Sequence, residues 1–291
     1  MRAHSGVRIS MTIQTALLQG TRLLEEGAIA APRLTAEVLL THALHRERAY
    51  LYAHPEEELT EVAWIHYGRY LHERLKGKPT QYITGRQEFY GRDFRVTPSV
   101  LIPRPETEHL VSACLSRIRP GDRMLDIGTG SGAIAVTLAL ETSSRVVASD
   151  ISIPALGVAA YNAPRLQADV TFLACDLASS FADRSFDVVV SNPPYVPRTD
   201  EAGLQREVRD YEPHVALFAG ATGLEIYERL IAEAARVLRP GGWLLVELGY
   251  NSVDPVRAML VTGWREITVE QDLAGLPRVL AARLRGSKID L

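Results

Sequence analysis

A run of three valines that ends in two prolines constrains this chain more than any other stretch. Residues 186–191 read Phe-Asp-Val-Val-Val-Ser, a pattern typical of a parallel strand that is buried on both faces. Pro193 and Pro194 follow almost at once, and proline continues neither a sheet ladder nor a helix. The sequence therefore predicts a stiff loop, residues 192–195, at the carboxyl end of a central strand, where open α/β sheets bind their ligands.

The atoms of this loop suit a planar –NH2 group. Asn192 offers a side-chain carbonyl acceptor and an amide donor. The carbonyl groups of Pro193 and Pro194 need no local partner, and the restricted backbone before proline fixes their direction. Tyr195 adds an aromatic face for a planar partner. The other interpretation is a proline-rich turn with a surface tyrosine, and the upstream sequence favours the binding loop.

A second motif, upstream, predicts a nucleoside site. Residues 123–127 form a short apolar strand, the loop Gly-Thr-Gly-Ser-Gly follows, and a helical run begins at Ala133. Such glycines allow a tight turn and close backbone approach to a ligand at a helix N-terminus. The next strand, residues 145–149, ends at Asp150, which is placed to accept hydrogen bonds from ribose hydroxyls. The loop residues are Gly128, Thr129, Gly130, Ser131 and Gly132.

Two cofactors compete for this loop. Gly128, Gly130 and Ala133 also match the dinucleotide pattern G-x-G-x-x-A, so an NAD site is an alternative. Two features argue against NAD. Asp126, directly before the loop, suits an ammonium group such as that of S-adenosylmethionine. The loop after Ser191 does not suit hydride transfer. Further along the chain, Asp176 is placed to accept from an adenine amino group, with Leu177 packed on the ring.

The remaining pattern alternates strands with helices. We expect strands at 170–173 and 175–177, a long connection at 196–222, a helix at 224–238 and a strand at 243–248. Final strands are expected at 266–269 and 278–282. This alternation predicts an α/β fold, a doubly wound Rossmann-like sheet, over residues 89–291.

Residues 1–88 are expected to form a small helical domain. Leucines at helical spacing predict one helix from Ile13 and a second that opens at Pro32 and closes at Leu44. Pro55 and the three glutamates after it fit the first turn of another helix. Residues 1–10 lack the apolar core of a secretory signal and are interpreted as an extension before Met11. The segment offers no catalytic groups, and a packing or interaction module is expected.

The connector between these regions carries an unusual motif. A hairpin is expected around Gly91, followed by Pro-Arg-Pro-Glu-Thr-Glu at 103–108. Pro105 suits the start of a helix, with acidic residues in its first turn. Arg104 and Pro105 are candidate ligand contacts. Arg104, between two prolines, either faces a carboxylate of a bound ligand or pairs with a nearby acid.

Composition excludes several classes of function. The net charge of −3 over 291 residues gives no basic surface for a nucleic-acid backbone. Cys114 and Cys175 lie in apolar surroundings and are interpreted as buried thiols, and the histidines show no metal-ligand spacing. No apolar run is long enough for a membrane span. We expect a cytoplasmic protein without metal, membrane or direct nucleic-acid binding.

Taken together, the motifs resemble those of the HemK/PrmC family, methyltransferases that modify the glutamine of the Gly-Gly-Gln tripeptide in peptide-chain release factors. The matching stretches span nearly the whole chain from Met11, and are residues 34–44, 50–55, 101–108, 126–135 and 192–195. An Asn-Pro-Pro-Tyr loop alone is shared with amino-methylating DNA enzymes. Its combination with the motif at 103–108 and with a helical N-terminal domain is much more specific.

The resemblance implies a helical domain that docks the release factor and a domain that binds S-adenosylmethionine. Gly128 to Gly132 would bind the methionine moiety, Asp150 the ribose, and Asp176 with Leu177 the adenine. Family members often carry an aromatic residue at the position of Leu177, which argues against ring stacking there. Asn192 and Pro193 would bind the glutamine amide, with Tyr195 packed against it.

Two other functions remain open on the sequence. An adenine-N6 methyltransferase acting on DNA or RNA would share the Asn-Pro-Pro-Tyr loop but needs a basic recognition surface. A nucleotide-binding module without chemistry would share only the glycine loop.

Overall fold

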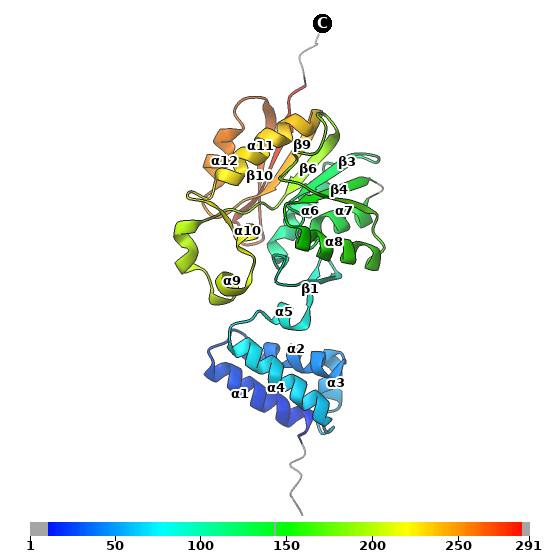
Figure 1. The fold of residues 1–291 in the computed structure, drawn as a ribbon, viewed down its shortest axis with the longest axis vertical. Helices are drawn as coiled ribbons and strands as arrows, with labels where there is room; N and C mark the ends of the chain where they lie inside the picture. Colours follow the sequence, from blue (N-terminus) through cyan, green and yellow to red (C-terminus); the bar gives the residue numbers. More distant parts are fainter. Residues whose placement is uncertain (1–10, 143, 287–291) are drawn as a thin grey trace, which may run out of the picture. The chain divides into compact units, whose positions relative to one another are not determined.

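The computed structural model describes residues 11–142 and 144–286, and the chain divides into two compact units after Gly85 (Figure 1). The sequence predicts this boundary after residue 88. Strand β1 (Arg86–Phe89) begins at Arg86 and pairs with β2 (Arg92–Arg95), so residues 86–88 belong to a hairpin of the second unit. The predicted extension at residues 1–10 lies outside the described residues.

The first unit is helical. Its core is one apolar cluster that includes Ile13 and Leu17 of the first helix, Leu39 and Leu40 of the second, and the fully buried Tyr67 of the fourth. The predicted second helix has the expected ends, and the first extends to Glu26. The helices are α1 (Ile13–Glu26), α2 (Pro32–Leu44), α3 (Arg48–Ala53), α4 (Glu61–Leu75) and α5 (Thr80–Thr84).

The helix predicted at Pro55 does not form. The backbone carbonyls of Pro55 and Glu57 instead accept the N–H groups of Gln14 and Ile13, both at 2.9 Å. The first N–H groups of a helix have no partner within the helix, and this turn supplies partners to α1. The fourth helix starts later, at Glu61, where the Thr60 hydroxyl accepts from the N–H of Ala63 at 3.2 Å and caps it.

The second unit is built on a mixed seven-stranded sheet in the order β10-β11-β9-β6-β3-β4-β5. The last five of these run parallel to one another, and β11 pairs antiparallel with both β9 and β10. The predicted doubly wound α/β fold is confirmed. The strands are β3 (Arg123–Ile127), β4 (Arg145–Asp150), β5 (Val170–Ala174), β6 (Phe186–Ser191), β9 (Leu238–Glu247), β10 (Trp264–Gln271) and β11 (Pro277–Leu284).

Helices cover both faces of this sheet (Figure 1). Val188 and Val190 of β6 belong to the apolar cluster on the face covered by α6, α7 and α8, whereas Val189 belongs to the cluster under α11 and α12. All three valines are buried, so the prediction of a strand covered on both faces is confirmed. The helices are α6 (Glu108–Leu115), α7 (Ala133–Glu141), α8 (Ile153–Arg165), α11 (Glu225–Val237) and α12 (Val253–Met259).

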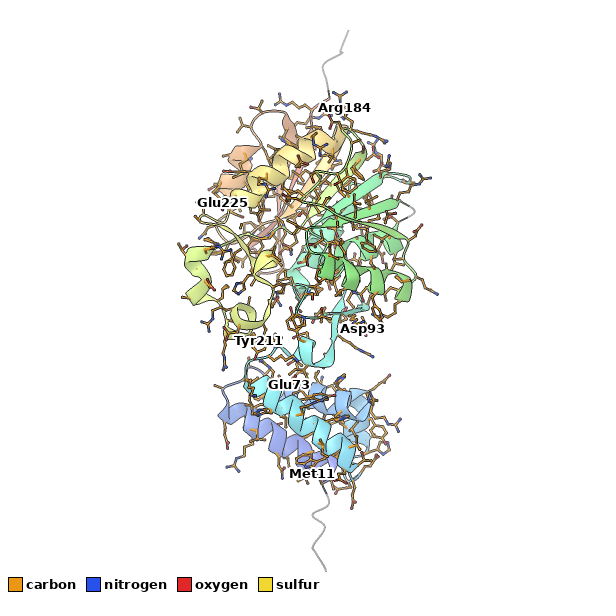
Figure 2. All side chains as sticks on the ribbon, in the orientation of Figure 1. Met11, Glu73, Asp93, Arg184, Tyr211 and Glu225 are labelled. Atoms are coloured by element: carbon orange, nitrogen blue, oxygen red, sulfur yellow. The ribbon has the colours of Figure 1, made fainter. Side chains whose placement is uncertain are left out.

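Two segments differ from the expectation in ways that matter for the site. Residues 175–177, predicted as a strand, form a loop after β5, and Leu177 has a φ of 50° that a strand does not allow. The connection after residue 195 folds into short elements, and Tyr211 ends one of its helices (Figure 2). These elements are β7 (Val196–Pro197), η2 (Arg198–Gly203), α9 (Arg206–Tyr211), α10 (His214–Leu217) and β8 (Phe218–Gly220).

Candidate active site

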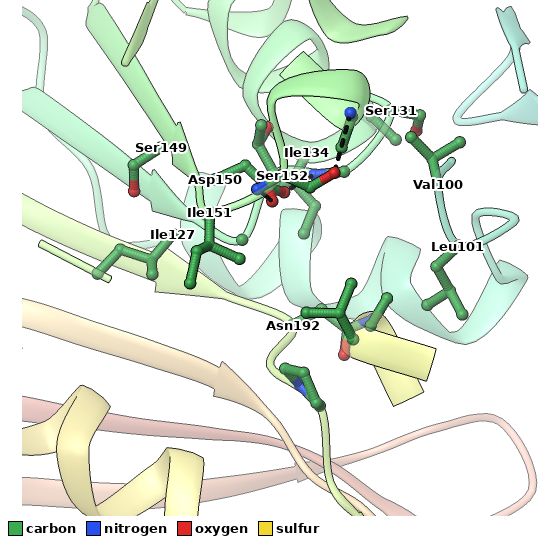
Figure 3. Close-up of a pocket in the computed structure, with 18 of the residues that line it drawn as sticks. Val100, Leu101, Ile127, Ser131, Ile134, Ser149, Asp150, Ile151, Ser152 and Asn192 are labelled. Atoms are coloured by element: carbon green, nitrogen blue, oxygen red, sulfur yellow. Dashed lines mark hydrogen bonds between the residues drawn. The ribbon is translucent and has the colours of Figure 1, made fainter. Parts of the chain in front are cut away.

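A cavity of about 200 Å³ lies beyond the carboxyl ends of the parallel strands of the second unit. Its wall combines Gly128 after β3, Asp150 at the end of β4, Leu177 after β5 and Asn192 after β6. Figure 3 shows Ile151 and Asn192 in this cavity, although they follow different strands. In the sheet, β4 lies on one side of β3 and β6 lies on the other, so the order of the strands reverses at β3. Doubly wound sheets bind their ligands at such a reversal.

The glycine loop leads from β3 into α7 and leaves its backbone open to the cavity. A Cβ built on Gly128 or Gly130 meets no protein atom within 4 Å. Gly132, at the N-terminus of α7, has a φ of 82°, and its added Cβ would lie 3.1 Å from the Cβ of Ala159 in α8. Only glycine combines that backbone conformation with that close packing.

Asp126 lies behind this loop and is fully buried. Its Oδ2 accepts from the Thr129 hydroxyl at 2.6 Å and from the N–H of Ala135 at 3.2 Å. Its Oδ1 has no hydrogen-bond partner among the described residues. Burial raises the pKa of Asp126 to about 7, while these two hydrogen bonds lower it. An unpaired buried carboxylate oxygen is costly unless a donor reaches it.

Asp150 fixes the shape of the loop. Its Oδ2 accepts from the N–H of Gly130 and its Oδ1 from the N–H of Ser152, both at 2.8 Å. Burial raises its pKa above the ordinary value, and the backbone hydrogen bonds oppose that shift. A carboxylate has about four acceptor positions, so Asp150 retains positions for hydroxyl groups in the cavity.

The loop after β5 supplies the next part of the wall. Asp176, predicted to accept from adenine, lines the cavity and pairs with Arg229 of α11 at 2.5 Å. The backbone carbonyl of Leu177 accepts from the Ser149 hydroxyl at 2.9 Å, which ties this loop to β4. Leu177 thereby keeps its left-handed backbone and its place in the wall. Cys175 is half-buried and lines the cavity, whereas Cys114 is fully buried in the core.

The Asn-Pro-Pro-Tyr loop follows β6 as predicted. Asn192 and Pro194 line the cavity, and the Nδ2 of Asn192 donates to the Thr107 hydroxyl at 3.2 Å. Tyr195 packs against the core instead, where a Cβ added to Gly249 would lie 2.7 Å from its ring. Burial raises the pKa of Tyr195 to about 12, so its hydroxyl stays neutral.

Arg104 pairs with a protein acid. Its Nη2 contacts the Oε1 of Glu212, a buried residue after α9. The other carboxylate oxygen of Glu212 accepts from the N–H of Ile102 at 3.2 Å. This contact joins the connector to the long segment after β6, and of the two roles left open for Arg104 the structure shows the ion pair.

The structure brings most predicted site residues together. Those that line the cavity are Arg104, Gly128, Thr129, Gly130, Ser131, Asp150, Asp176, Leu177, Asn192 and Pro194. The described lining does not include Pro105, Asp126, Gly132, Pro193 or Tyr195.

Sequence reasoning missed other parts of the wall. Ile151 directly follows Asp150 and exposes 59% of its surface, an unusual environment for isoleucine that position alone could have suggested. Val215 and Ala216 come from the long connection, and Arg229 comes from α11. Thr107 lies within the predicted motif but carried no predicted role.

Within residues 11–142 and 144–286, no cluster of histidine, cysteine or acidic side chains has the arrangement of a metal site. Over the same residues, no helix combines the length and the apolar character needed to cross a membrane.

The cavity fits S-adenosylmethionine in its chemistry. The open backbone of Gly128 and Gly130 suits the methionine part, and the unpaired Oδ1 of Asp126 lies buried behind this loop, outside the cavity lining. Asp150 suits the ribose hydroxyls, and Ile151 and Leu177 provide apolar surface for the adenine ring.

Comparison with known proteins gives consistent results. The family "PrmC N-terminal domain" matches residues 15–85, and "Methyltransferase small domain" matches residues 106–207. The chain is 47% identical over 278 residues to a release factor glutamine methyltransferase of Koribacter versatilis, covering 94% of this chain and 99% of the relative. A relative of the same name from Nitratidesulfovibrio vulgaris is 43% identical over 280 residues, covering 94% and 95%. A methyltransferase structure from Pyrococcus furiosus shares the fold, with a TM-score of 0.53 and 20% identity over 68% of this chain and 91% of that chain.

The fold and the cavity define an S-adenosylmethionine-dependent methyltransferase with a Rossmann-like domain. The relatives are similar over nearly their whole length. The chain belongs to the release factor glutamine methyltransferase family, as its motifs predicted.

Proposed function

We propose that this protein transfers a methyl group from S-adenosylmethionine to the side-chain amide nitrogen of the glutamine in the Gly-Gly-Gln tripeptide of peptide-chain release factors. The observation that carries this proposal is the position of Asn192. It stands at the carboxyl end of the central β6, in the wall of the cavity that Asp150 and the glycine loop also line. An amide acceptor beside a cofactor cavity suits an –NH2 substrate.

When bound, S-adenosylmethionine supplies an electrophilic methyl group on its sulfonium. The protein has to orient a poor nucleophile, because the lone pair of a carboxamide nitrogen is delocalised. Asn192 donates its own N–H to Thr107, which leaves its Oδ1 as an acceptor for a substrate N–H. In our proposal the Pro193 carbonyl accepts the other N–H. Two fixed acceptors orient the nitrogen and stabilise positive charge that develops on it.

The proton that leaves the nitrogen needs no strong base, because an N-alkylated amide cation loses a proton readily. We therefore assign no general base among the described residues. Tyr195, whose ring packs against Gly249, is proposed to support the loop from the core side.

The first unit is proposed to dock the release factor. Its exposed apolar side chains support this role, since large apolar residues on a surface often mark protein contacts. They include Leu18, Leu23, Leu34, Tyr52, Val62 and Ile65. A substrate of the translation machinery supports a cytoplasmic location, which is part of this proposal.

The alternative, methylation of adenine in DNA or RNA, requires a basic surface along a phosphate backbone. The net charge of −3 does not supply one, so glutamine is the better-supported substrate.

Methyl transfer from labelled S-adenosylmethionine to a recombinant release factor tests the proposal, with duplex DNA as a parallel substrate and mass spectrometry to locate the methyl group. We expect label on the Gly-Gly-Gln glutamine and none on DNA. Label on DNA, or on another residue of the factor, would overturn the proposal.

Asn192→Ala should lower kcat by roughly 10²–10³-fold, the effect of deleting one preorganised hydrogen-bonding group at a reacting centre. The fold should be unchanged, which circular dichroism and thermal unfolding would verify. Asn192→Asp keeps an acceptor and loses the donor to Thr107, so its kcat should fall between those of the wild type and Asn192→Ala. A kcat near the wild-type value for Asn192→Ala would reduce the loop to a structural turn.

A further inference from the structure

A chain of two hydrogen bonds, the first partly buried and the second buried, runs from Asn192 into the protein interior. The Nδ2 of Asn192 donates to the Oγ1 of Thr107 at 3.2 Å, and the Thr107 hydroxyl donates to the Oε2 of Glu247 at 2.6 Å. The three residues come from the loop after β6, from the short helix η1 (Pro105–Thr107), and from the end of β9. Three segments far apart in the sequence therefore meet behind the proposed substrate contact.

The chain has a direction. An ionised carboxylate accepts hydrogen bonds and donates none. While Glu247 is ionised, above its pKa of about 7, the single proton of the Thr107 hydroxyl is committed to Glu247, so only lone pairs of the Thr107 oxygen face Asn192. Asn192 must then present its –NH2 group to Thr107, and its Oδ1 lies at the other end of the planar amide.

The burial of Glu247 is difficult to explain by stability alone. Glu247 exposes 2% of its surface and Thr107 exposes 4%. Burial raises the pKa of Glu247 to about 7, whereas the Thr107 hydroxyl and the charge of Arg278 lower it. An apolar side chain of similar volume is often at least as stable at such a position.

We propose that Thr107 and Glu247 are positioning residues that determine which end of the Asn192 amide faces the substrate. This inference rests on the proposed function, because it concerns the recognition of an –NH2 group. With the amide reversed, the –NH2 of Asn192 would meet the –NH2 of the glutamine, and two donors would face each other. The chain through Thr107 excludes that arrangement before the substrate arrives.

Thr107→Val tests the inference, because valine keeps the shape of threonine and removes the hydroxyl. The Asn192 amide then loses its internal partner and can rotate. We expect kcat for release factor to fall on the order of 10-fold, the effect of one buried donor left unpaired. The KM for release factor and the calorimetric Kd of S-adenosylmethionine should change less than about 2-fold. Thr107→Ser, which restores the hydroxyl, should recover most of the lost kcat.

A matched control is available on α7. Thr137 is fully buried, and its hydroxyl has no hydrogen-bond partner among the described residues. Thr137→Val should therefore leave kcat unchanged. This control separates the loss of the Asn192–Thr107–Glu247 hydrogen bonds from the general effect of replacing a buried threonine with valine.

A double-mutant cycle gives the sharpest readout. If Thr107 acts through Asn192, adding Thr107→Val to Asn192→Ala should lower kcat by less than about 2-fold further. An effect of similar size in both backgrounds would mean that Thr107 acts independently of Asn192, and would overturn the inference.

Glu247→Met provides a second variant in case Thr107→Val does not fold. It removes the acceptor, so the Thr107 hydroxyl can turn toward the amide, and kcat should fall as in Thr107→Val. An unchanged kcat for either folded variant, or no recovery with Thr107→Ser, would overturn the inference while glutamine methylation by the wild-type protein stands. Absence of that methylation in the wild type would instead overturn the proposed function and this inference with it.

Discussion

Glu247 shows how a single buried acid couples the site to the stability of the protein. Its side chain is buried, with Thr107 in direct contact and the charges of Arg278, Glu106 and Arg104 acting from further away. Burial disfavours the charged form. The carboxyl group of Glu247 therefore stays protonated to a higher pH in the native protein than in the unfolded chain.

The pH dependence of stability should reveal this proton. The pKa of Glu247 is about 7 in the folded protein against 4.5 for an ordinary glutamate, so the stability it contributes is fully present below 4.5 and is lost as the pH rises through 7. Glu247→Gln carries no such proton. From pH 5 to pH 8 the stability of the variant relative to wild type should rise by on the order of 2–3 kcal/mol.

Urea unfolding of both proteins at the two pH values would measure this difference. Asp126, whose pKa is also raised to about 7, is present in both proteins and cancels in the comparison. A relative stability that does not change with pH would show that Glu247 is ionised over the whole range.

Two glycines within helices of the first unit have opposite environments. Gly20 of α1 faces the fully buried Tyr67 of α4, and an added Cβ would lie 2.0 Å from the tyrosine hydroxyl oxygen. Gly68 of α4 is exposed, and an added Cβ meets nothing within 4 Å. The first glycine permits close packing of two helices, and the second costs conformational entropy without a packing benefit.

Alanine substitutions should therefore change stability in opposite directions. Gly68→Ala should stabilise by about 0.5–1 kcal/mol, the difference in helix propensity. Gly20→Ala should destabilise by roughly 1–3 kcal/mol, because the core around Tyr67 is overpacked. Thermal unfolding of the two variants beside the wild type checks both signs. Destabilisation by both would mean that position 68 has a packing role that the structure does not show.

The elements that the sequence predicted well have strong periodic patterns. The three consecutive valines led to a correct prediction of both ends of β6. The leucines at helical spacing, with Pro32 at the start, did the same for α2. The missed elements lack such signals. Helix α3 has only six residues. The acidic turn at Pro55 has the sequence of a helix start, and its actual partner, the N-terminus of α1, is remote in sequence, so no local pattern indicates the contact.

At the scale of the whole molecule, the site residues that could be predicted from the sequence lie next to a strand end or in the glycine loop. Asp150 and Asn192 could be placed because the carboxyl ends of parallel strands meet at one edge of a sheet. The contacts between Arg104 and Glu212 and between Thr107 and Glu247 could not be predicted from the sequence. Each joins segments more than 100 residues apart, and no local pattern in either segment identifies its partner.

The two units also differ in what they contribute. All residues that line the cavity belong to the second unit, which has apolar clusters on both faces of its sheet, whereas the first unit has a core of its own. A chain that begins at Arg86 should therefore fold and bind S-adenosylmethionine with little change in Kd, which calorimetry would verify.

Loss of the first unit should affect substrates unequally. If this unit docks the release factor, its removal should lower kcat/KM for the whole factor by roughly 10-fold or more relative to a short Gly-Gly-Gln peptide, the effect of losing about 1.4 kcal/mol of docking free energy. The peptide lacks the docking surface, so its turnover should depend mainly on the cavity. Measuring both substrates with both chains isolates the docking contribution as a ratio of ratios. Equal losses on the two substrates would show that residues 11–85 stabilise the fold and do not recognise the factor.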